Sequence, residues 1–340
     1  MTRALEEGAK GLGRTAPNPA VGAVVVRDGV EIGAGWHRRA GCPHAEREAM
    51  ARVAEVHGLG ALRGATIYVT LEPCSTHGRT PPCTEGLIES GISRVVYGAV
   101  DPNPRHAGGA DGILGKAGIE VCRGVLEAEC GELIRGFVKV QQTGRPWVIW
   151  KSAMSLDARL TRPAGEGMWL TGEAARAEVQ KLRAACEAIV TGGETVRRDK
   201  PRLDLREPSY LEGREIPLRV VISNRPESLP ADAPLFCDAA AHRTRVLPWG
   251  DPGELLESLA REDGVNTVLL ECGGRLAGAW MDAGCIDEIA VFLAPRLCGG
   301  PDVPLAGLGF PEGITLGNPR FRKIGPDVLL RAVVARQSGC

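Results

Sequence analysis

The amino-acid sequence predicts two layered α/β domains. Strand patterns alternate with helix patterns through both halves of the 340 residues, which is the order expected when helices cover both sides of a sheet. The length exceeds what one ordinary hydrophobic core organises. A polar segment that contains glycine and proline, residues 141–146, is a suitable linker. We therefore expect one domain at residues 1–143 and a second at residues 146–340.

In the first half, a strand is expected at residues 65–70, where apolar and polar side chains alternate. A helix is expected at 44–57, where Ala45, Ala49 and Val53 fall on one face. Asp28 and Gly29 predict a tight turn between strands at 21–26 and 31–35. Further strands are expected at 94–100 and 119–122, and further helices at 2–12, 83–90, 110–117 and 126–140.

The second half continues the alternation. Thr171 is expected to cap a helix that runs to Arg183. Strands are expected at 147–152, 188–191, 218–223, 266–271, 288–293 and 327–334, and helices at 253–262 and 276–283. Glycine pairs follow two of these strands, at 192–193 and 273–274, where a helix N-terminus can receive a phosphate. Neither pair fits G-x-G-x-x-G, so a tight turn is an equally consistent interpretation of each.

Composition narrows the classes of partner. The chain is 44% hydrophobic and 24% charged, with a formal charge of −1, which gives no electrostatic reason to expect nucleic acid or a membrane as partner. No apolar run reaches the ~18 residues of a membrane span, and no signal peptide precedes the first helix. The 11 cysteines are odd in number and irregularly spaced. We expect them to be reduced and mostly buried in a cytoplasmic protein.

A set of metal-binding residues lies in the first half. His44 follows Pro43, Cys74 follows Pro73 and Cys83 follows Pro82. A catalytic zinc takes three Cys or His ligands and leaves one position open for water. Glu46, two residues after the histidine, is then free to carry protons, and H-x-E followed by P-C and a second cysteine is the signature of zinc-dependent base deaminases.

Two other interpretations of these residues remain open. Isolated cysteines and histidines are commonly core residues, and a structural zinc would take a fourth ligand, for which His77 is available. The context favours catalysis, because Pro43 and Pro82 are well placed to begin helices. His44 and Cys83 would then lie at helix N-termini, where a thiolate is favoured.

Charged residues of the second half lie near the expected strand ends and adjoining loops, where α/β proteins form ligand sites. Each would be a solvated surface residue by default. They are Lys151, Arg183, Asp199, Arg206 and Glu271.

Over nearly its whole length the chain resembles the RibD family of bifunctional riboflavin-biosynthesis proteins. In the first half the resemblance depends on residues 17–19, 35–37, 44–46, 69–74, 77–83 and 101–104. In the second half it depends on Lys151, residues 155–157, 169–171, 195–196, Asp199, Pro201, Arg206, Glu271 and residues 276–278. The resemblance implies a cytidine-deaminase-like first domain and a dihydrofolate-reductase-like second domain.

The resemblance also implies two successive reactions. The first domain would deaminate 2,5-diamino-6-(5-phosphoribosylamino)pyrimidin-4(3H)-one, with zinc on His44, Cys74 and Cys83 and Glu46 as proton carrier. The second would use NADPH to reduce the ribosyl group of the product to ribityl, with Lys151 and Asp199 at the reacting sugar. Substrate is a small phosphorylated pyrimidine, and the expected assembly is a homo-oligomer, a dimer.

The family pattern further assigns binding residues by matching position. Substrate contacts are expected at Asn18, His37, Gly167, Arg183, Leu203, Arg206 and Glu271. Cofactor contacts are expected at Ala153, Trp169, Thr195, Asp199, Asn224, Gly273, Gly274, Arg275, Leu276, Ala277, Gly278 and Ala279. Arg183 and Arg206 offer fork-shaped donors for the substrate phosphate.

Several positions depart from the family pattern, and other functions stay open. Departures are Thr76 for histidine, Ala158 for glycine, Gly167 and Asn224 for serines, and Gly274-Arg275 for Pro-Thr. One alternative is a deaminase that acts on a free or nucleic-acid base, with a degenerate reductase domain. A different class is a binding module built around a structural zinc.

Overall fold

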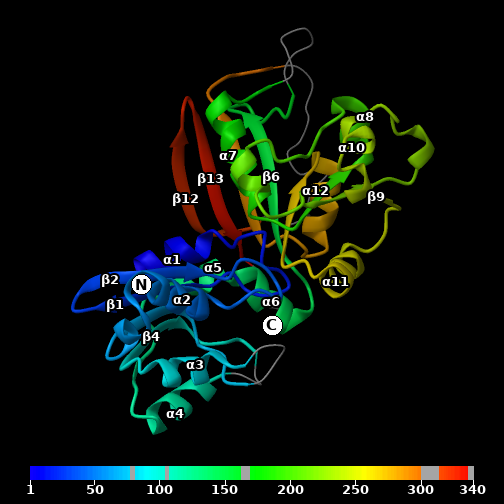
Figure 1. Cartoon of the computed structure of the whole chain (residues 1–340). Helices are drawn as coiled ribbons and strands as arrows, with labels where there is room; N and C mark the ends of the chain where they lie inside the picture. The colour runs from blue at the N-terminus through cyan, green and yellow to red at the C-terminus, as the bar shows by residue number, and fades with distance from the viewer. Residues whose placement is uncertain (77–80, 104–106, 162–168, 300–313, 336–340) are drawn as a thin grey trace, which may run out of the picture. The chain divides into compact units, whose positions relative to one another are not determined.

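The computed structural model describes residues 1–76, 81–103, 107–161, 169–299 and 314–335. The chain divides into two compact units, Met1–Gly144 and Arg145–Cys340 (Figure 1). The division falls inside the segment expected as a linker, although α6 continues through the first part of that segment. Gly144 ends this helix with φ +74, a left-handed conformation that suits glycine.

The first unit is built on a five-stranded sheet of order β2-β1-β3-β4-β5. The first two strands form an antiparallel hairpin, whereas β3, β4 and β5 run parallel to one another. The strands are β1 (Gly22–Arg27), β2 (Val30–Trp36), β3 (Thr66–Leu71), β4 (Arg94–Ala99) and β5 (Glu120–Cys122).

Helices cover both faces of this sheet, as predicted. One face packs on α2 (Ala45–His57), α3 (Cys83–Ser90) and α4 (Gly109–Lys116), and the short η1 (Leu59–Leu62) follows α2. The other packs on α1 (Thr2–Ala9), α5 (Glu127–Leu133) and α6 (Arg135–Thr143). The single helix expected at 126–140 is wrong, because Ile134, with φ −108 and ψ 12, separates α5 from α6.

Four chain segments meet at one edge of the first sheet. Gly22 at the start of β1 lies opposite Trp36 at the end of β2, and Ala23 lies opposite Val69 of β3. Since β4 runs parallel to β3, its carboxyl end lies at the same edge. Residues before β1, after β2, after β3 and after β4 are therefore neighbours, and the predicted zinc ligands lie in or next to these segments.

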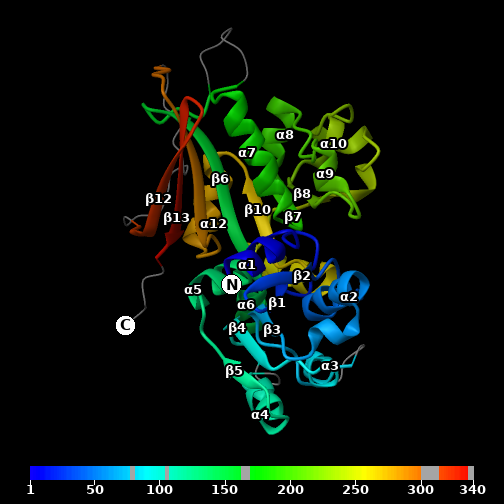
Figure 2. The ribbon, with the colours of Figure 1, turned by 60° about the vertical axis from the view of Figure 1, so that its left-hand side comes forward.

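The second unit is built on an eight-stranded sheet of order β12-β13-β11-β6-β10-β7-β8-β9 (Figure 2). The strands from β11 to β9 are parallel, and β13 and β12 close one side as an antiparallel hairpin. They are β6 (Trp147–Ser155), β7 (Ala188–Gly192), β8 (Leu218–Ile222), β9 (Thr244–Leu247), β10 (Thr267–Glu271), β11 (Glu288–Ala294), β12 (Leu316–Ile324) and β13 (Asp327–Val334).

Two of these strands were not predicted. β12 is mostly exposed and contains Pro319 among basic residues, so it lacks apolar alternation. Proline is tolerated there because β12 is an edge strand. β9, at the opposite edge, is only four residues long. Neither edge strand could therefore be predicted from a pattern of buried residues.

Helices again cover both faces. One face packs on α7 (Glu173–Ala184), α8 (Gly193–Asp199) and α10 (Pro234–Cys237). The other packs on α11 (Pro252–Asp263) and α12 (Gly274–Asp282). The short α9 (Pro208–Leu211), η2 (Pro226–Ser228) and η3 (Ala241–Arg243) lie in connecting segments. The predicted layered α/β fold is thus confirmed in both units.

Two general features concern the described residues. None of their helices combines the length and the apolar character that crossing a bilayer requires. Their ten cysteines are all free thiols. Four of the ten are buried, five are half-buried and Cys237 is exposed, so the expectation that most would be buried is wrong.

Glu187, just before β7, gives the second unit a testable pH dependence. Its Oε2 atom accepts the backbone N–H groups of Asn266 at 3.1 Å and Thr267 at 2.7 Å. Burial raises the pKa of this carboxyl group to about 7 from 4.5. The native state therefore holds a proton that the unfolded state loses above pH 4.5. Stability is fully present below pH 4.5 and falls as the pH rises through 7.

We expect Glu187→Gln to remove this dependence, because one amide oxygen still accepts both N–H groups without a buried charge. Between pH 5 and pH 8, the melting temperature of wild type should fall more than that of the variant. The difference corresponds to a loss of up to about 3 kcal/mol in the free energy of unfolding. Glu227→Gln, an exposed change in η2, is the control and should follow wild type. Equal pH dependence of Glu187→Gln and wild type would refute the assignment.

Candidate active sites

The three predicted zinc ligands lie together in the first unit. His44 is the N-cap of α2, Cys83 is the first residue of α3, and Cys74 follows β3. The Nδ1 atom of His44 lies 3.5 Å from the sulfur of Cys74 and 3.4 Å from the sulfur of Cys83. All three ligand atoms lie within 4.8 Å of one another.

These separations fit zinc. Zn–S bonds of about 2.3 Å and Zn–N bonds of about 2.0 Å in tetrahedral geometry require N···S distances of about 3.5 Å. Among the described residues, no other group of His, Cys, Asp or Glu side chains has the geometry of a metal site. His77, the candidate for a fourth ligand, lies outside the described residues.

The surroundings favour a thiolate. The backbone N–H of Cys83 donates to the sulfur of Cys74 at 3.2 Å. The pKa of Cys74 is lowered to about 4, first by the hydrogen bond from the Cys83 thiol and further by His44 and this N–H group. The pKa of Cys83 is raised in turn by its bond to Cys74 and by burial. A divalent cation bound by both sulfurs would displace the proton of the Cys83 thiol.

Glu46 is a buried carboxyl group beside the ligands. It lies in the first turn of α2, two residues after His44, and is not a member of the ligand cluster. Burial, and then the negative charge of Cys74, raise its pKa. A carboxyl group whose pKa is raised in this way is suited to accept and return a proton near neutral pH.

His37 and Asn18, both expected to contact substrate, adjoin the ligand histidine. The ring of His37 meets that of His44 edge-on, with centroids 5.4 Å apart. The Asn18 amide nitrogen lies 3.0 Å from His37 Nε2, and His37 Nδ1 lies 2.9 Å from the Pro43 carbonyl. Since an amide nitrogen only donates, Nε2 accepts and Nδ1 carries the hydrogen. Burial lowers the pKa of His37, which agrees with this neutral ring.

Glu72 is a structural part of this site that we did not predict. Its buried carboxylate accepts three backbone N–H groups from the segment after β4, those of Asp101 at 3.3 Å, Gly108 at 3.0 Å and Ala110 at 3.2 Å. It therefore ties this segment to the chain two residues before Cys74. The signal in the sequence is an acid within the apolar run that leads to Pro73 and Cys74.

A buried cluster of charges lies in the second unit. Glu271, the last residue of β10, is the register partner of Lys151 on β6. Arg183 of α7 donates to Glu271 through Nε at 2.6 Å and Nη2 at 3.1 Å, and the Lys151 ammonium lies 3.8 Å from the same carboxylate. The pKa of Lys151 is lowered by burial, against the charge of Glu271.

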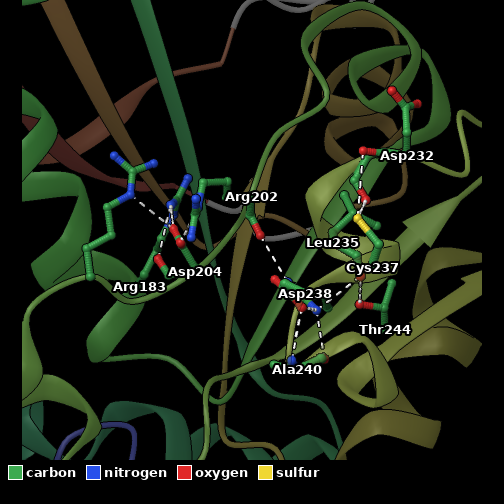
Figure 3. A network of polar contacts seen from close by, with 12 residues as sticks. Arg183, Arg202, Asp204, Asp232, Leu235, Cys237, Asp238, Ala240 and Thr244 are labelled. Atoms are coloured by element: carbon green, nitrogen blue, oxygen red, sulfur yellow. Dashed lines mark hydrogen bonds and ion pairs between the residues drawn. The ribbon is translucent and has the colours of Figure 1, made fainter.

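A loop of alternating charges adjoins this cluster. Asp204 pairs with Arg202 at 2.6 Å and with Arg206 at 3.2 Å, and its carbonyl accepts from Arg183 at 3.2 Å (Figure 3). The side chains of Arg202 and Arg206 are 59% and 50% exposed. Arg202 was not predicted, because a lone arginine in a loop has no distinguishing signal in the sequence.

The contacts revise two expectations about this cluster. The guanidinium group of Arg183 was expected to bind the substrate phosphate, but it is already bound to Glu271. The exposed Arg206 and Arg202 are therefore better hydrogen-bond donors for a phosphate. Asp199, at the end of α8, is exposed, and no hydrogen bond or ion pair among the described residues joins it to Lys151. Leu203, expected near substrate, has a buried side chain, so only its backbone is available.

Most of the predicted cofactor residues follow the carboxyl ends of β10, β7 and β8, which are adjacent in the sheet. Gly273 is the N-cap of α12, and a Cβ atom on it would meet nothing within 4 Å. A Cβ atom on Gly192 would lie 3.5 Å from Leu276, so the two glycine turns are neighbours. This open turn at a helix N-terminus fits a dinucleotide phosphate.

The other cofactor residues differ in how they are placed. Asn224 follows β8, and its Oδ1 atom accepts the Trp249 N–H at 2.7 Å. Trp169 is half exposed, with the Arg176 guanidinium 5.5 Å from its ring centroid. Ala153 is on β6, Thr195 on α8, and Gly274, Leu276, Ala277 and Gly278 on the buried face of α12, with Arg275 exposed and Ala279 half-buried. Gly167 lies outside the described residues.

Comparisons with known proteins extend over both units. The family described as RibD C-terminal domain matches residues 146–330, and the cytidine and deoxycytidylate deaminase zinc-binding region matches residues 1–99. The riboflavin biosynthesis protein RibD of Escherichia coli (strain K12) is 37% identical, covering 98% of both chains. That of Mycobacterium tuberculosis (strain ATCC 25618 / H37Rv) is 40% identical, covering 99% of this chain and 96% of the relative.

Solved structures agree with these relatives. RibD of Acinetobacter baumannii is 35% identical, with a TM-score of 0.84 over 98% of both chains. A Thermotoga maritima protein also has a TM-score of 0.84, with 32% identity over 98% of this chain and 97% of that one. It is described as a diaminohydroxyphosphoribosylaminopyrimidine deaminase/5-amino-6-(5-phosphoribosylamino)uracil reductase.

The position of Glu46 predicts that Glu46→Gln keeps zinc and loses deamination. The amide preserves the shape of the buried side chain but cannot take a proton, so the deaminase rate should fall by about 10²–10⁴-fold. Zinc content is measured by atomic absorption and turnover by ammonia release. The control is Glu55→Gln, an exposed change on the same helix. Near-normal turnover of a zinc-replete Glu46→Gln protein would contradict the role.

Proposed function

The chain belongs to the RibD family of bifunctional riboflavin-biosynthesis enzymes, and we propose that residues 1–143 carry out its deamination and residues 146–340 its reduction. The family combines a zinc-dependent deaminase with an NADPH-dependent reductase. The observation that carries the first assignment is the triangle of His44, Cys74 and Cys83 with Glu46 beside it. The second is supported by the charge cluster at Glu271 and the open glycine turn at Gly273.

We propose that the substrates are phosphorylated pyrimidines. The first would be 2,5-diamino-6-(5-phosphoribosylamino)pyrimidin-4(3H)-one, and its deaminated product, 5-amino-6-(5-phosphoribosylamino)uracil, would be the substrate of the reductase. The Thermotoga relative is described as having both of these activities. Four cations, Lys151, Arg183, Arg202 and Arg206, adjoin only two carboxylates in the second unit. This excess of positive charge supports binding of a phosphate.

In the deaminase, Glu46 is assigned the proton transfers. Zinc, when bound by His44, Cys74 and Cys83, supplies a Lewis acid that lets water react near neutral pH. Glu46 would take one proton from the attacking water and pass it to the ring nitrogen. It would then take the second proton from the hydroxyl group left on the ring carbon and pass it to the departing amine, so that ammonia leaves as the carbonyl forms. His37 and Asn18 are assigned substrate contacts, and Glu72 keeps the adjoining backbone in place.

In the reductase, the cluster is assigned the placement of the sugar. NADPH, when bound at the turn of Gly273 and Gly274, supplies the hydride for the ribosyl carbon. Lys151 is assigned the polarisation of the sugar oxygen, with Glu271 holding its ammonium group in place. Asp199 is assigned to the same sugar from the end of α8. Arg206 is assigned the phosphate.

The alternatives receive less support. A degenerate reductase would be expected to lose its charged residues, yet Lys151, Arg183 and Glu271 form a fully paired buried cluster. A purely structural zinc would be expected to have four protein ligands, whereas three described residues converge on the site. Free thiols at all ten described cysteines support our proposal that the enzyme acts in the reducing cytoplasm.

We also propose that the enzyme is a homodimer. The exposed edge strand β12 carries Phe321, which is 67% exposed, and such an edge offers a surface for pairing with a second copy. Sedimentation velocity would measure the mass in solution, and a monomer at all concentrations would exclude the dimer.

The domain assignment predicts that residues 1–144 fold by themselves. This piece contains a complete sheet with helices on both faces, and its last helix ends at Gly144. The purified piece should be soluble, bind one zinc and release ammonia from the diaminopyrimidine at a rate within about tenfold of the full chain. An aggregated or zinc-free piece would show that the boundary, or the independence of the unit, is wrong.

The open turn predicts that Gly273→Val weakens NADPH binding. A valine there meets no protein atom within 4 Å of its Cβ and needs no unusual backbone, so the variant should fold. Its side chain would occupy the space above the N-terminus of α12, and the Kd for NADPH should rise by at least about tenfold. Zinc content and deamination should not change.

The matched control for this variant is Gly317→Val, on the edge strand β12, where a Cβ atom also fits. Fluorescence titration with NADPH compares the two proteins. Unchanged affinity in a folded Gly273→Val protein would move the proposed cofactor site to the turn at Gly192 and Gly193.

A further inference from the structure

Arg219 is a buried cation that neither the expected site residues nor the proposed mechanism includes. It lies on β8, where every other residue is apolar, and its side chain is fully buried. An arginine side chain keeps its positive charge in proteins, so a charged group is buried here. Its Nε atom has no hydrogen-bond partner among the described residues, which adds to the cost of burial.

The rest of the guanidinium group joins two segments of the chain, and Figure 3 labels its partners Arg202, Leu235, Asp238 and Ala240. The Nη1 atom donates to the Arg202 carbonyl at 3.1 Å and to Asp238 at 2.7 Å. The Nη2 atom donates to the carbonyls of Leu235 at 3.0 Å and Ala240 at 2.7 Å, and to Asp238 at 2.9 Å. Arg219 therefore fixes the loop of Arg202 to α10 and the residues that follow it.

The loop that Arg219 holds has a strained backbone. Leu203 has φ +48, a left-handed conformation that costs energy for any residue with a Cβ atom. Its side chain is buried in the same core cluster as Leu235. The residues on either side of Leu203 in the sequence, Arg202 and Asp204, pair with each other at 2.6 Å. A strained loop persists only where its surroundings fix it, and the bond to the Arg202 carbonyl does so.

We propose that Arg219 is a positioning residue of the reductase, which holds the loop of residues 202–206 so that the guanidinium groups of Arg202 and Arg206 bind the substrate phosphate. This inference depends on the proposed function, because it takes that loop as the phosphate site. Arg219 itself would touch no substrate. It acts through the Arg202 carbonyl from the opposite side of the loop.

Stability alone does not account for this arrangement. A buried ion pair is commonly replaced by apolar residues without loss of stability, because removing both charges from water is costly. An apolar residue at position 219 would also continue the pattern of β8. What the guanidinium uniquely supplies is its fixed geometry, which holds three carbonyl groups and one carboxylate at once.

The experiment uses the full-length enzyme with Arg219→Met combined with Asp238→Leu, so that no buried charge is left unpaired. Reductase kinetics are measured with 5-amino-6-(5-phosphoribosylamino)uracil and with its dephosphorylated form, and inorganic phosphate is tested as a competitive inhibitor. We expect the KM for the phosphorylated substrate and the inhibition constant for phosphate to rise at least about tenfold. The kcat value, the KM for NADPH and the KM for the dephosphorylated substrate should stay within about threefold.

Two further variants make the test specific. Arg245→Met with Asp263→Leu removes another bidentate Arg–Asp pair of the same unit, which does not touch the loop, and should behave as wild type. Arg219→Lys keeps the charge but not the fork, and should recover part of the phosphate affinity. An unchanged KM in the folded double variant would overturn the proposal. A lower kcat together with a higher KM and a lower melting temperature in both Arg219 variants would also overturn it. Such a combined change would show a purely structural effect.

Arg206→Ala separates this inference from the proposed function. If Arg206→Ala leaves the KM for the phosphorylated substrate unchanged, the loop is not the phosphate site, and the proposed function is wrong on that point. If Arg206→Ala raises this KM and the Arg219 double variant does not, the phosphate site stands and only the role of Arg219 is overturned.

Discussion

The convergence of strand ends at one edge of a sheet is the constraint on which both sites depend. In the first unit the parallel pair β3 and β4 directs the segments after both strands to the same edge, and the reversed hairpin of β1 and β2 brings Asn18 and His37 there as well. In the second unit β10, β7 and β8 deliver their glycine turns and polar residues side by side. Residues far apart in the sequence become neighbours because hydrogen-bonded register allows no other arrangement.

Sequence patterns predicted the parts of this enzyme that depend on local chemistry. The cluster of His44, Cys74 and Cys83 was predicted because metal binding restricts residue type, and the helix starts at His44 and Cys83 because proline restricts the backbone. The exposed strand β12 and the break at Ile134 were missed, since neither is marked by burial or periodicity. Glu72 and Arg219 were missed for a different reason. Each binds backbone groups that are distant in the sequence, and no spacing in the sequence records such contacts. Arg202 was missed because a lone arginine in a loop has no distinguishing signal.

One departure from the family pattern affects the backbone conformation. Ala158 stands where the resemblance led us to expect glycine, and its φ is +59, in the left-handed region that glycine adopts freely. The neighbouring contacts hold it there: the Ala158 N–H donates to the Ser155 carbonyl, and Asp157 accepts the backbone N–H groups of Cys298 and Gly299. The substitution therefore carries strain at a turn and changes no side chain of the charge cluster.

Both sites are also held in a similar way, through backbone groups next to the functional residues. His37 binds the carbonyl of Pro43, the residue before His44, and Glu72 binds three N–H groups near the cysteine segment. Arg219 binds the carbonyl of Arg202. A polar side chain that was itself fixed by hydrogen bonds would lose the donors or acceptors that its function needs. Support through adjacent backbone limits this loss: Arg202 and Arg206 each donate to Asp204 through Nε alone, and their Nη atoms are left for an anion.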